Sequence, residues 1–434
     1  MVTGNEYIFD NIYEAREHVL AIEAKALSND VRRKTAPVCI NPPLFNVPFD
    51  KYVKMAHVPI NSLDYSYNAY FNEADDSKFI MSKLKSGRYS LKPNLKNRKF
   101  LFRGENSFHS QCKPILFRDP DKKYFLDSMI YAHEMMMLIL SHPLVQLLDF
   151  GVKLNGKLVR FEMNLYGLLQ HYYNKSNLLD LTSDIDVALF FATQKYDNRL
   201  DKYSPIINED HEPGILYYYD IDIERDFKQQ ANGEQLSTIG LQVFPRSGIQ
   251  KGFLYKLNID GNFNILPQLR AFRFKHNAEI AKEISARMNQ GNILFPNDIL
   301  KKHWLNSSII KKNVVSKDAV MVNLMFNHSE TFESIKEKLR TLYNISIENY
   351  KSRFTEEELH EYYEMIKKSA YWQDFCNQIY IPGDVNGNMM EDLLNLPNNP
   401  EYEWAFKEGG LHKPDYKQGY LLKMFEHILD NGIK

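Results

Sequence analysis

The stretch that decides the fold runs from residue 170 to residue 192 and reads QHYYNKSNLLDLTSDIDVALFFA. Residues 178–181 are a short apolar run between polar residues, which predicts a strand. Ser183, followed three residues later by Asp186, has the pattern of a capping box and predicts that a helix begins here. Three apolar residues then recur at helical spacing and would form the buried face of that helix: Val187, Phe190 and Phe191.

A second strand is predicted over residues 99–104, KFLFRG, which are apolar and aromatic enough to be buried. Gly104 would let the backbone turn sharply, and Arg103 at the strand end would point into a cleft. Thr182 and Ser183 would lie where the other strand gives way to its helix, a place where free N–H groups and the helix dipole favour an anion. Further strands are expected at residues 214–223 and within 243–257, and further helices at 124–140, at 278–289 and within the first thirty residues, where apolar positions repeat from Ala15 to Ala26.

Composition restricts the class of protein. With 434 residues, 44% of them hydrophobic and 25% charged, the chain is long enough for about two or three globular domains, which excludes disordered and fibrous classes. The net charge is −1, so a nucleic acid would have to be bound by a local basic patch. No apolar run reaches the roughly 20 residues that a membrane span needs, so no membrane association is expected.

Cysteine usage and the first residues predict a cytoplasmic location. Cys39, Cys112 and Cys376 are far apart in sequence, which fits a reducing compartment and argues against disulfides and a cysteine zinc site. The first residues carry acids where a secretory signal would need a basic start and an apolar core.

The strongest basic run leads into the second predicted strand. A solvated surface is the default interpretation, but interleaved aromatic residues would also suit nucleic acid, whose binding would then weaken steeply with salt. The residues proposed to contact RNA or DNA are Lys83, Lys85, Arg88, Lys92, Lys96, Arg98 and Lys99. Before this run, prolines 37, 42, 43, 48 and 59 predict that residues 38–64 form a loop or short edge strands.

Several familiar motifs are incomplete. His133-Glu134 begins like a zinc-protease helix but lacks the second histidine. Residues 384–388 have the alternating oxygens of a calcium loop, but Met389 stands where glycine is needed, so a turn is expected. Cys112 near His109 could be a thiol and its base, although such spacing is common by chance. No dinucleotide-binding glycine motif, phosphate loop or serine-hydrolase elbow occurs, and no metal site is expected.

Taken together, five motifs between residues 96 and 305 resemble the FRG domain, a family named for its Phe-Arg-Gly strand. They are Phe102-Arg103-Gly104, Gln170-His171-Tyr172, Leu178-Leu179-Asp180 with Thr182, the run ALFFA at residues 188–192, and Gln250-x-Gly252. The chain departs from the family pattern at residues 173–177, YNKSN, where Gly-Leu-Pro-Thr-Arg is usual, and at Leu181, where Trp is usual.

The FRG pattern is in turn similar to the ADP-ribosyltransferase core, in which an arginine, a Ser-Thr-Ser segment and a glutamate from three strands surround NAD. The resemblance implies that Arg103 binds the diphosphate or ribose, that Thr182 and Ser183 fix the sugar, and that Gln250 falls near the glutamate. It makes His171 a candidate base and Tyr172 a stacking surface for nicotinamide. Gly104 and Asp180 complete the implied cofactor site, and Asp180 is a candidate assisting carboxylate.

Each of these residues also has a purely structural interpretation. Arg103 could pair with a buried acid such as Asp180, and Thr182 and Ser183 could only cap a helix. His171 could be a structural imidazole, and Gln250 could bond a strand edge. Their occurrence together in one chain favours a site.

The expected architecture is α+β, with an ADP-ribosyltransferase-like FRG core and a mainly helical C-terminal region. The expected segments are residues 1–95, 96–305 and 306–434. The expected function is NAD-dependent ADP-ribose transfer to a macromolecule, with nucleic acid favoured over protein, in a toxin or phage-defence effector that could have an inhibitory partner protein. The alternative is a non-catalytic module that binds a nucleotide or nucleic acid.

Overall fold

The computed structural model of the chain describes residues 1–29, 75–84, 86–118, 125–173, 175–197, 202–208, 211–222, 226, 236–306, 313–326, 329–368 and 370–410. The predicted loop over residues 38–64 lies outside these ranges, and so do residues 411–434 of the expected helical C-terminal region.

The chain divides into two compact units, each assembled from separate stretches of sequence. The first comprises residues 1–83, 91–118 and 177–296, and the second comprises residues 84–90, 119–176 and 297–434. The three contiguous segments expected from the sequence have their boundaries after residues 95 and 305. That these segments are separate domains stays a prediction.

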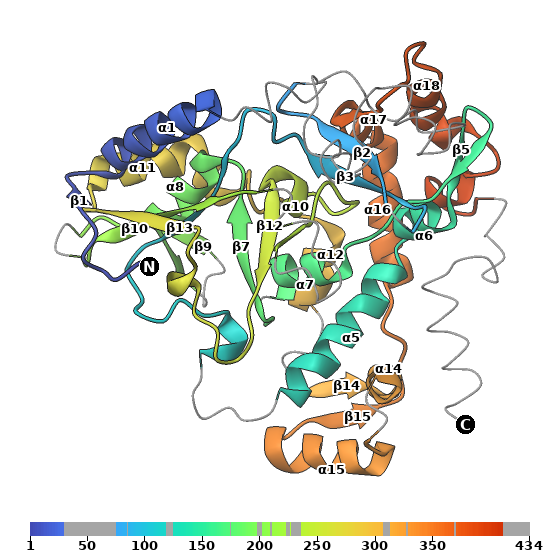
Figure 1. Cartoon of the computed structure of the whole chain (residues 1–434). Helices are drawn as coiled ribbons and strands as arrows, with labels where there is room; N and C mark the ends of the chain where they lie inside the picture. Colours follow the sequence, from blue (N-terminus) through green and yellow to red (C-terminus); the bar gives the residue numbers. More distant parts are fainter. Residues whose placement is uncertain are drawn as a thin grey trace. The chain divides into compact units, whose positions relative to one another are not determined.

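The first unit is built on a seven-stranded sheet, in which β1 runs parallel to its neighbour and the other adjacent strands run antiparallel (Figure 1). In spatial order the strands are β1 (Ile8–Phe9), β13 (Leu269–Phe274), β10 (Gly214–Asp220), β4 (Phe100–Glu105), β7 (Leu178–Thr182), β12 (Gly252–Lys256) and β11 (Leu236–Thr238). The predicted strands at residues 99–104, 178–181 and 214–223 are therefore present, and the first of them, β4, is the central strand.

Alternation along β4 sends its side chains into two different cores. Phe100 and Phe102 pack in the core beneath the helices of this unit, whereas Leu101 packs in the core on the opposite face. Because successive side chains of a strand point to opposite faces, Arg103 and Glu105 share the face of Leu101. The core on that face also takes in side chains from the neighbouring strands: Leu179, Leu181, Ile215, Tyr217, Tyr219, Phe253 and Tyr255.

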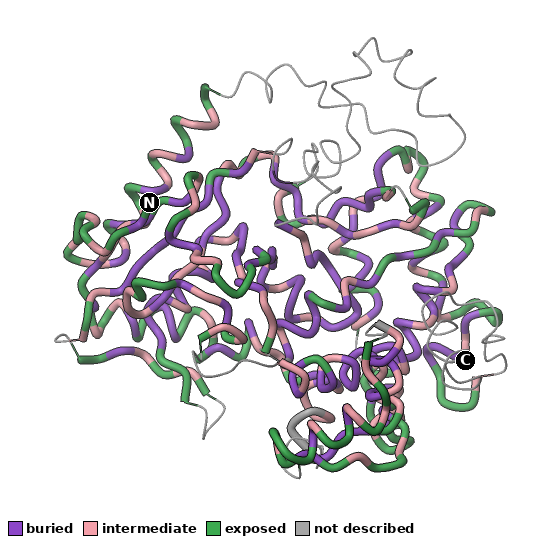
Figure 2. Tube along the Cα trace, turned by 60° about the horizontal axis from the view of Figure 1, so that its bottom comes forward, coloured by how far each residue is buried: buried purple, intermediate pink, exposed green. Residues whose placement is uncertain are grey.

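Three helices contribute to the core that contains Phe100 and Phe102. They are α1 (Ile12–Asn29), α8 (Ile185–Thr193) and α11 (Ala278–Arg287). Val187 and Phe190 of α8 are buried in this core and Phe191 packs partly buried against it, as the sequence predicts. Figure 2 shows buried, intermediate and exposed positions alternating along α1, which is the pattern of a helix with one apolar face.

A buried carboxylate fixes α1 to the start of β4. Glu23 on α1 is only 2% exposed. It accepts hydrogen bonds from the backbone N–H groups of Lys99 (2.7 Å) and Phe100 (3.0 Å) and from the guanidinium of Arg98 (3.3 Å). These donors compensate the cost of burying the charge.

The helix after β7 begins one residue later than the capping pattern suggests. Asp184, and not Ser183, is the N-cap of α8, and its side chain accepts a hydrogen bond from the N–H of Asp186 at 3.0 Å. The predicted pairing of Ser183 with Asp186 is therefore wrong. Aspartate and serine are both good caps, so the pattern alone does not fix which of two neighbours takes the role.

The second unit is mainly helical among its described residues. The helices α5 (Leu126–Leu140), α14 (Lys317–Phe326) and α15 (Phe332–Tyr343) share one core with the parallel strands β14 (Val314–Ser316) and β15 (Ser346–Glu348). Its other elements include α6 (Pro143–Phe150), the hairpin of β5 (Val152–Leu154) and β6 (Lys157–Val159), α7 (Leu165–Tyr173), α12 (Ile299–Asn306), α16 (Glu356–Lys368), α17 (Tyr371–Asn377) and α18 (Asn388–Leu394).

The mixture of sheets and helices confirms the predicted α+β class. The helical C-terminal region is present as far as it is described, in α14 to α18. Within the described ranges, none of the helices is long and apolar enough to cross a membrane.

Candidate functional site

The end of β4 carries two opposite charges on one face of the sheet. Arg103 and Glu105 are two residues apart on the strand, and Arg103 lies opposite Tyr217 of β10 in the antiparallel register. Side chains opposite one another in a sheet point the same way. A guanidinium, a carboxylate and a phenol are therefore brought to the same face of the central strands.

Strands β4 and β7 separate beside this cluster. β4 pairs with β10 through six residues and β7 pairs with β12 through five, but β4 and β7 share a single register pair, Phe102 with Thr182. Beyond that pair the guanidinium of Arg103 donates a hydrogen bond from Nη1 to the backbone carbonyl of Asp180 at 2.8 Å. A side chain thus replaces the strand-to-strand hydrogen bond at this point.

Arg103 and Glu105 form a mostly buried ion pair. The Glu105 Oε1 atom accepts from Arg103 Nε at 2.8 Å and lies 2.7 Å from Nη2, and the two side chains are 14% and 10% exposed. Burial by itself would raise the pKa of Glu105, but Arg103, helped by His109 and Arg118, holds it below its ordinary value. Burial opposes the charged form of Arg103 as well, and Glu105 outweighs this effect and raises the Arg103 pKa. Both groups therefore stay charged.

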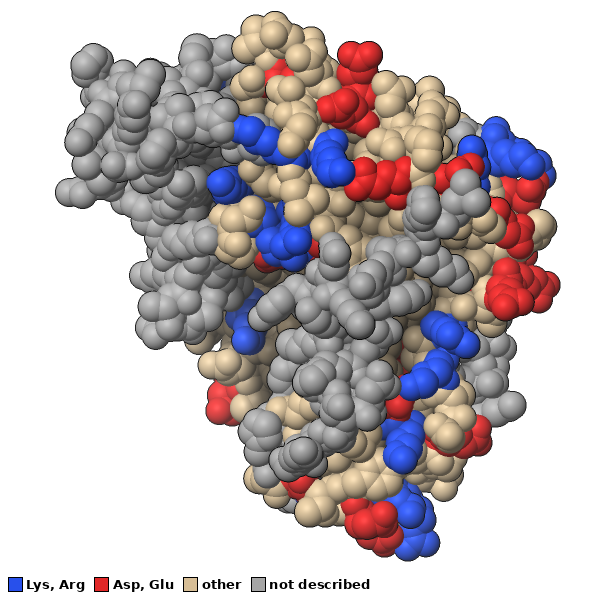
Figure 3. All heavy atoms as spheres, turned by 90° about the vertical axis from the view of Figure 1, so that its right-hand side faces the viewer, with Lys and Arg blue, Asp and Glu red and all other residues tan. Residues whose placement is uncertain are grey.

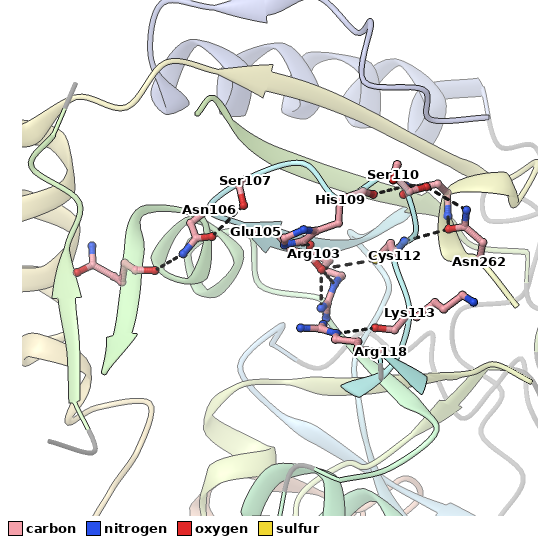
Figure 4. A network of polar contacts seen from close by, with 12 residues as sticks. Arg103, Glu105, Asn106, Ser107, His109, Ser110, Cys112, Lys113, Arg118 and Asn262 are labelled. Carbon is pink, nitrogen blue, oxygen red and sulfur yellow. Dashed lines mark hydrogen bonds and ion pairs between the residues drawn. The ribbon is translucent and has the colours of Figure 1, made fainter. Parts of the chain in front are cut away.

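Two buried side chains, Cys112 and Tyr217, complete the cluster. Figure 4 shows the polar contacts around Arg103 and Glu105. Cys112 Sγ lies 3.5 Å from Glu105 Oε1, and burial, reinforced by the Glu105 charge, raises the Cys112 pKa to about 12. Burial and the same charge also raise the pKa of Tyr217. Cys112 is thus a neutral thiol at physiological pH, which argues against the thiol-and-base interpretation of Cys112 with His109.

Gly104 lies on the opposite face of β4 and serves the packing of α8. A Cβ atom on Gly104 would lie 1.9 Å from the backbone oxygen of Ala188 and 2.8 Å from the Cβ of Ala192. The glycine of the Phe-Arg-Gly motif therefore allows a helix to approach the strand closely. The predicted sharp turn is not present at Gly104, because β4 continues to Glu105.

Thr182 and Gln250 are brought together, on the face away from Arg103. The Thr182 hydroxyl donates to the backbone carbonyl of Gln250 at 2.7 Å and accepts from the N–H of Asp184 at 2.9 Å. The Gln250 amide donates to the backbone carbonyl of Leu294 at 2.9 Å. Gln250 itself ends the short helix α10 (Arg246–Ile249), just before β12. Ser183 is buried beside them. These contacts are structural, but they differ from the predicted ones, because Asp184 caps α8 and Leu294 does not belong to a strand.

His171 and Tyr172 lie on α7 in the second unit. The Tyr172 hydroxyl donates to Asp298 Oδ2 at 2.6 Å, and Asp298 Oδ1 accepts from the N–H of Lys301 in the first turn of α12. This contact links the two stretches of the second unit that hold α7 and α12.

The basic run is partly neutralised by acids. Arg88 pairs with the buried Asp149, Arg98 with Glu23 at 3.3 Å, and Lys99 with Asp220 at 2.9 Å. Lys83 is exposed, and Lys85 lies outside the described residues. On the face shown in Figure 3, the described Lys and Arg side chains are interspersed with Asp and Glu. The run is thus less cationic than its sequence suggests.

The incomplete metal motifs have structural roles. Glu134 on α5 is buried and accepts hydrogen bonds from the N–H and the hydroxyl of Ser316 through Oε2. Asp384 accepts from the N–H groups of Met389 and Met390, which begin α18, so the calcium-like segment is a turn. Within the described ranges, no group of three or more His, Cys, Asp or Glu residues could hold a metal ion.

Comparison with family models identifies the domain. The model of the FRG domain family matches residues 98–200, so the chain contains an FRG domain. The match includes Arg103, His171 and Thr182 and draws on parts of both compact units, whereas Gln250 lies outside it. Comparison with curated proteins gave no match, and comparison with solved structures gave none either.

Glu105 and Tyr217 are the cluster residues that sequence reasoning did not select. The signal for Glu105 was available, because alternation along β4 places residues 101, 103 and 105 on one face. Tyr217 could not be found in this way. Its position opposite Arg103 depends on the register between β4 and β10, two strands more than 100 residues apart in the chain.

Proposed function

We propose that the FRG domain binds NAD and transfers its ADP-ribose group to a macromolecule. The observation that carries the proposal is the ion pair of Arg103 and Glu105 at the point where β4 and β7 part. It supplies the two charges that this chemistry needs, held by the backbone of one strand.

Arg103 is suited to anchoring the diphosphate of NAD. A guanidinium has five N–H donors in a planar fork, and its contacts with Glu105 and Asp180 use three of them. The remaining two can bind phosphate oxygens. Such charge-assisted hydrogen bonds are stronger than those between neutral groups.

Glu105 is suited to the charge that develops during transfer. The bond between ribose C1′ and the nicotinamide nitrogen breaks, nicotinamide leaves with the electron pair as a neutral molecule, and C1′ forms a bond to an acceptor atom that gives up its proton. Positive charge builds on the ribose before the new bond is complete. A fixed carboxylate in a partly dehydrated site stabilises such charge, and this assigns to Glu105 the role that Gln250, a neutral amide, cannot fill.

The acceptor is proposed to be a macromolecule. The one feature that favours nucleic acid over protein as the acceptor is the basic run. The ion pairs of Arg88, Arg98 and Lys99 weaken that support. A cytoplasmic toxin or phage-defence effector, held in check by an inhibitory partner protein, stays a prediction from the family resemblance. Incubation with labelled NAD and either total RNA, DNA or cell protein would identify the acceptor class.

A second candidate function is a module that binds a nucleotide without transferring it. It is favoured by the contacts of Thr182 and Gln250, whose polar groups are occupied by backbone hydrogen bonds. In this case Arg103 would bind the phosphates and no bond would break.

The deciding experiment measures NAD binding by calorimetry and nicotinamide release by chromatography, on wild type and on Arg103→Ala and Arg103→Lys. The lysine variant keeps a positive charge beside Glu105 in case the alanine variant does not fold. Arg98→Ala is the matched control, since it removes an ion-paired arginine that precedes β4.

If the protein transfers ADP-ribose, wild type should bind NAD and release nicotinamide. Both activities should fall sharply in the two Arg103 variants and persist in Arg98→Ala. Binding without release would establish the module instead. If wild type neither binds NAD nor releases nicotinamide, both candidates are wrong.

A further inference from the structure

Two polar atoms of the Arg103 cluster have no hydrogen-bond partner among the described residues, although both are buried. They are Glu105 Oε2 and the hydroxyl of Tyr217. Glu105 is 9% exposed and Tyr217 is fully buried. Buried polar groups are nearly always hydrogen-bonded, so two unpaired atoms in one cluster call for a partner, either a ligand group or a water molecule.

The two oxygens of Glu105 have unequal surroundings. Oε1 is contacted by Arg103 through two nitrogens and by the thiol of Cys112. The His109 Nε2 atom lies 3.9 Å from Oε2, which is beyond hydrogen-bond distance. One oxygen thus holds the pair together, and the other is buried without a hydrogen-bond partner among the described residues.

The protonation states of the two groups are complementary. The pKa of Glu105 is held below its ordinary value, so its carboxylate only accepts hydrogen bonds at neutral pH. The pKa of Tyr217 is raised by burial, so its phenol keeps the proton and can donate. The charge of Glu105 raises the Tyr217 pKa and that of Arg103 lowers it, which places these three groups in one electrostatic environment.

We propose that Glu105 Oε2 and the Tyr217 hydroxyl form a subsite for the hydroxyls of the second ribose, the one not attached to adenine, of an ADP-ribose-type nucleotide whose phosphates are bound by Arg103. One ribose hydroxyl donates to Glu105, and the neighbouring hydroxyl accepts from Tyr217. This rests on the proposed function, in that the nucleotide is of the ADP-ribose type, and it assigns the sugar to residues other than Thr182 and Ser183.

Charge and polarity argue against a phosphate or an apolar group as the occupant. A phosphate at this position would be repelled by Glu105, and an apolar group would leave both buried atoms unpaired. A hydroxyl is neutral and both donates and accepts. Next to a guanidinium that binds phosphate, ribose supplies such hydroxyls in adjacent pairs.

His109 is an exposed neighbour of the Glu105 carboxylate. Its side chain is 54% exposed, whereas that of Glu105 is 10% exposed, and the ring lies on the side of Oε2. The ring would move aside for a ribose to reach the carboxylate. His109 belongs to a segment of turns and irregular backbone after β4, which has no strand or helix hydrogen bonds to break.

The test compares two probes, ADP-ribose and ADP, by calorimetry on the full chain. ADP-ribose carries the second ribose and ADP does not, and both carry the diphosphate. The variants are Glu105→Gln and Tyr217→Phe. Tyr218→Phe is the matched control, because it removes a phenol hydroxyl from the same strand on the opposite face. Thermal unfolding of each variant establishes that it folds.

The expected result is that Glu105→Gln weakens ADP-ribose binding about tenfold and Tyr217→Phe about fivefold relative to ADP. ADP itself binds equally well or more tightly to Glu105→Gln, since the amide competes less with phosphate for Arg103. Tyr218→Phe leaves the ratio of the two dissociation constants unchanged.

An unchanged ratio in both variants overturns the subsite, as would occur if the two atoms only bind a water molecule. Absence of ADP-ribose binding by wild type overturns it too. If wild type releases nicotinamide but the variants leave the ratio of the ADP-ribose and ADP dissociation constants unchanged, the proposed transfer stands and the subsite alone is wrong. If the dissociation-constant ratios change as expected but wild type releases no nicotinamide, the subsite stands and the proposed transfer is wrong.

Discussion

Arg103 bridges the parting of the central sheet by donating to the backbone carbonyl of Asp180. The contact places a charged side chain where the register of β4 and β7 stops after a single pair. Arg103 therefore has a structural role in addition to any ligand contact. Substitutions of Arg103 must be interpreted with both in mind, since loss of activity alone does not separate them.

The ion pair of Arg103 with Glu105 should dominate the stability of this part of the sheet. Arg103→Met leaves a buried carboxylate without its cation, and we expect the free energy of unfolding to fall by about 3 kcal/mol. Adding Glu105→Leu removes the stranded charge, so the double variant should be more stable than the sum of the single changes by about 2 kcal/mol. Urea denaturation of the four proteins measures this coupling. Simple additivity would show that the pair is not coupled.

Gly104→Ala should destabilise the first unit through α8. The added Cβ would meet the Ala188 backbone oxygen at 1.9 Å, so the helix must move away from β4. We expect a loss of about 3 kcal/mol, at the upper end of the cost of overpacking. Ala192→Gly in the same chain should not restore stability, because the closest clash is with main-chain oxygen and not with the Ala192 side chain. Rescue by Ala192→Gly, seen as a recovered melting temperature, would contradict this account.

Gln250→Glu distinguishes the structural interpretation of Gln250 from the catalytic one. If Gln250 occupied the glutamate position of a transferase, the exchange would keep or raise turnover. In the structure its amide donates to the Leu294 carbonyl at 2.9 Å, and a carboxylate cannot donate. We therefore expect the free energy of unfolding to fall by about 2 kcal/mol at neutral pH.

Acidification provides the control for this variant. A protonated carboxyl can donate to Leu294 again, so the stability gap between Gln250→Glu and wild type should narrow as pH falls. Gln250→Met, which cannot donate at any pH, should show a constant gap. A Gln250→Glu protein of wild-type stability with higher nicotinamide release would restore the catalytic interpretation.

The sequence predicted the central elements because their signals are local. Alternating aromatic residues mark β4, an apolar run marks β7, and the spacing of Val187, Phe190 and Phe191 marks α8. The presence of an arginine at the end of β4 could be read directly, and so could the resemblance to the FRG domain.

The contacts of the site could not be predicted in the same way. The acid that pairs with Arg103 is Glu105 and not Asp180, and Asp180 contributes its backbone carbonyl instead. That outcome depends on where β4 and β7 separate, which is decided by long-range packing. The hydrogen bond from Thr182 to Gln250 likewise joins strand β7 to the end of α10, and no local pattern connects them.

Stability of the second unit should depend on a buried neutral histidine. His142 is 2% exposed and is the N-cap of α6, where its Nδ1 atom accepts a hydrogen bond from the N–H of Leu144 at 3.2 Å. Burial lowers the pKa of His142 to about 3, and that of His133 on α5 to about 4. A protonated His142 could no longer accept at Nδ1, so folding requires the neutral ring.

The direction of the pH dependence follows from these shifts. Both folded-state pKa values lie below the unfolded value of about 6.5, so the unfolded chain binds these protons first. The stabilisation is fully present above pH 6.5 and is lost as pH falls toward 3. Each histidine contributes a loss of about 1.4 kcal/mol per pH unit below 6.5. His142→Asn keeps a capping oxygen without a titrating group and should reduce the slope between pH 6.5 and 5 by about 1.4 kcal/mol per pH unit, measured by urea denaturation. An unchanged slope in that variant would show that His142 is not protonated on unfolding.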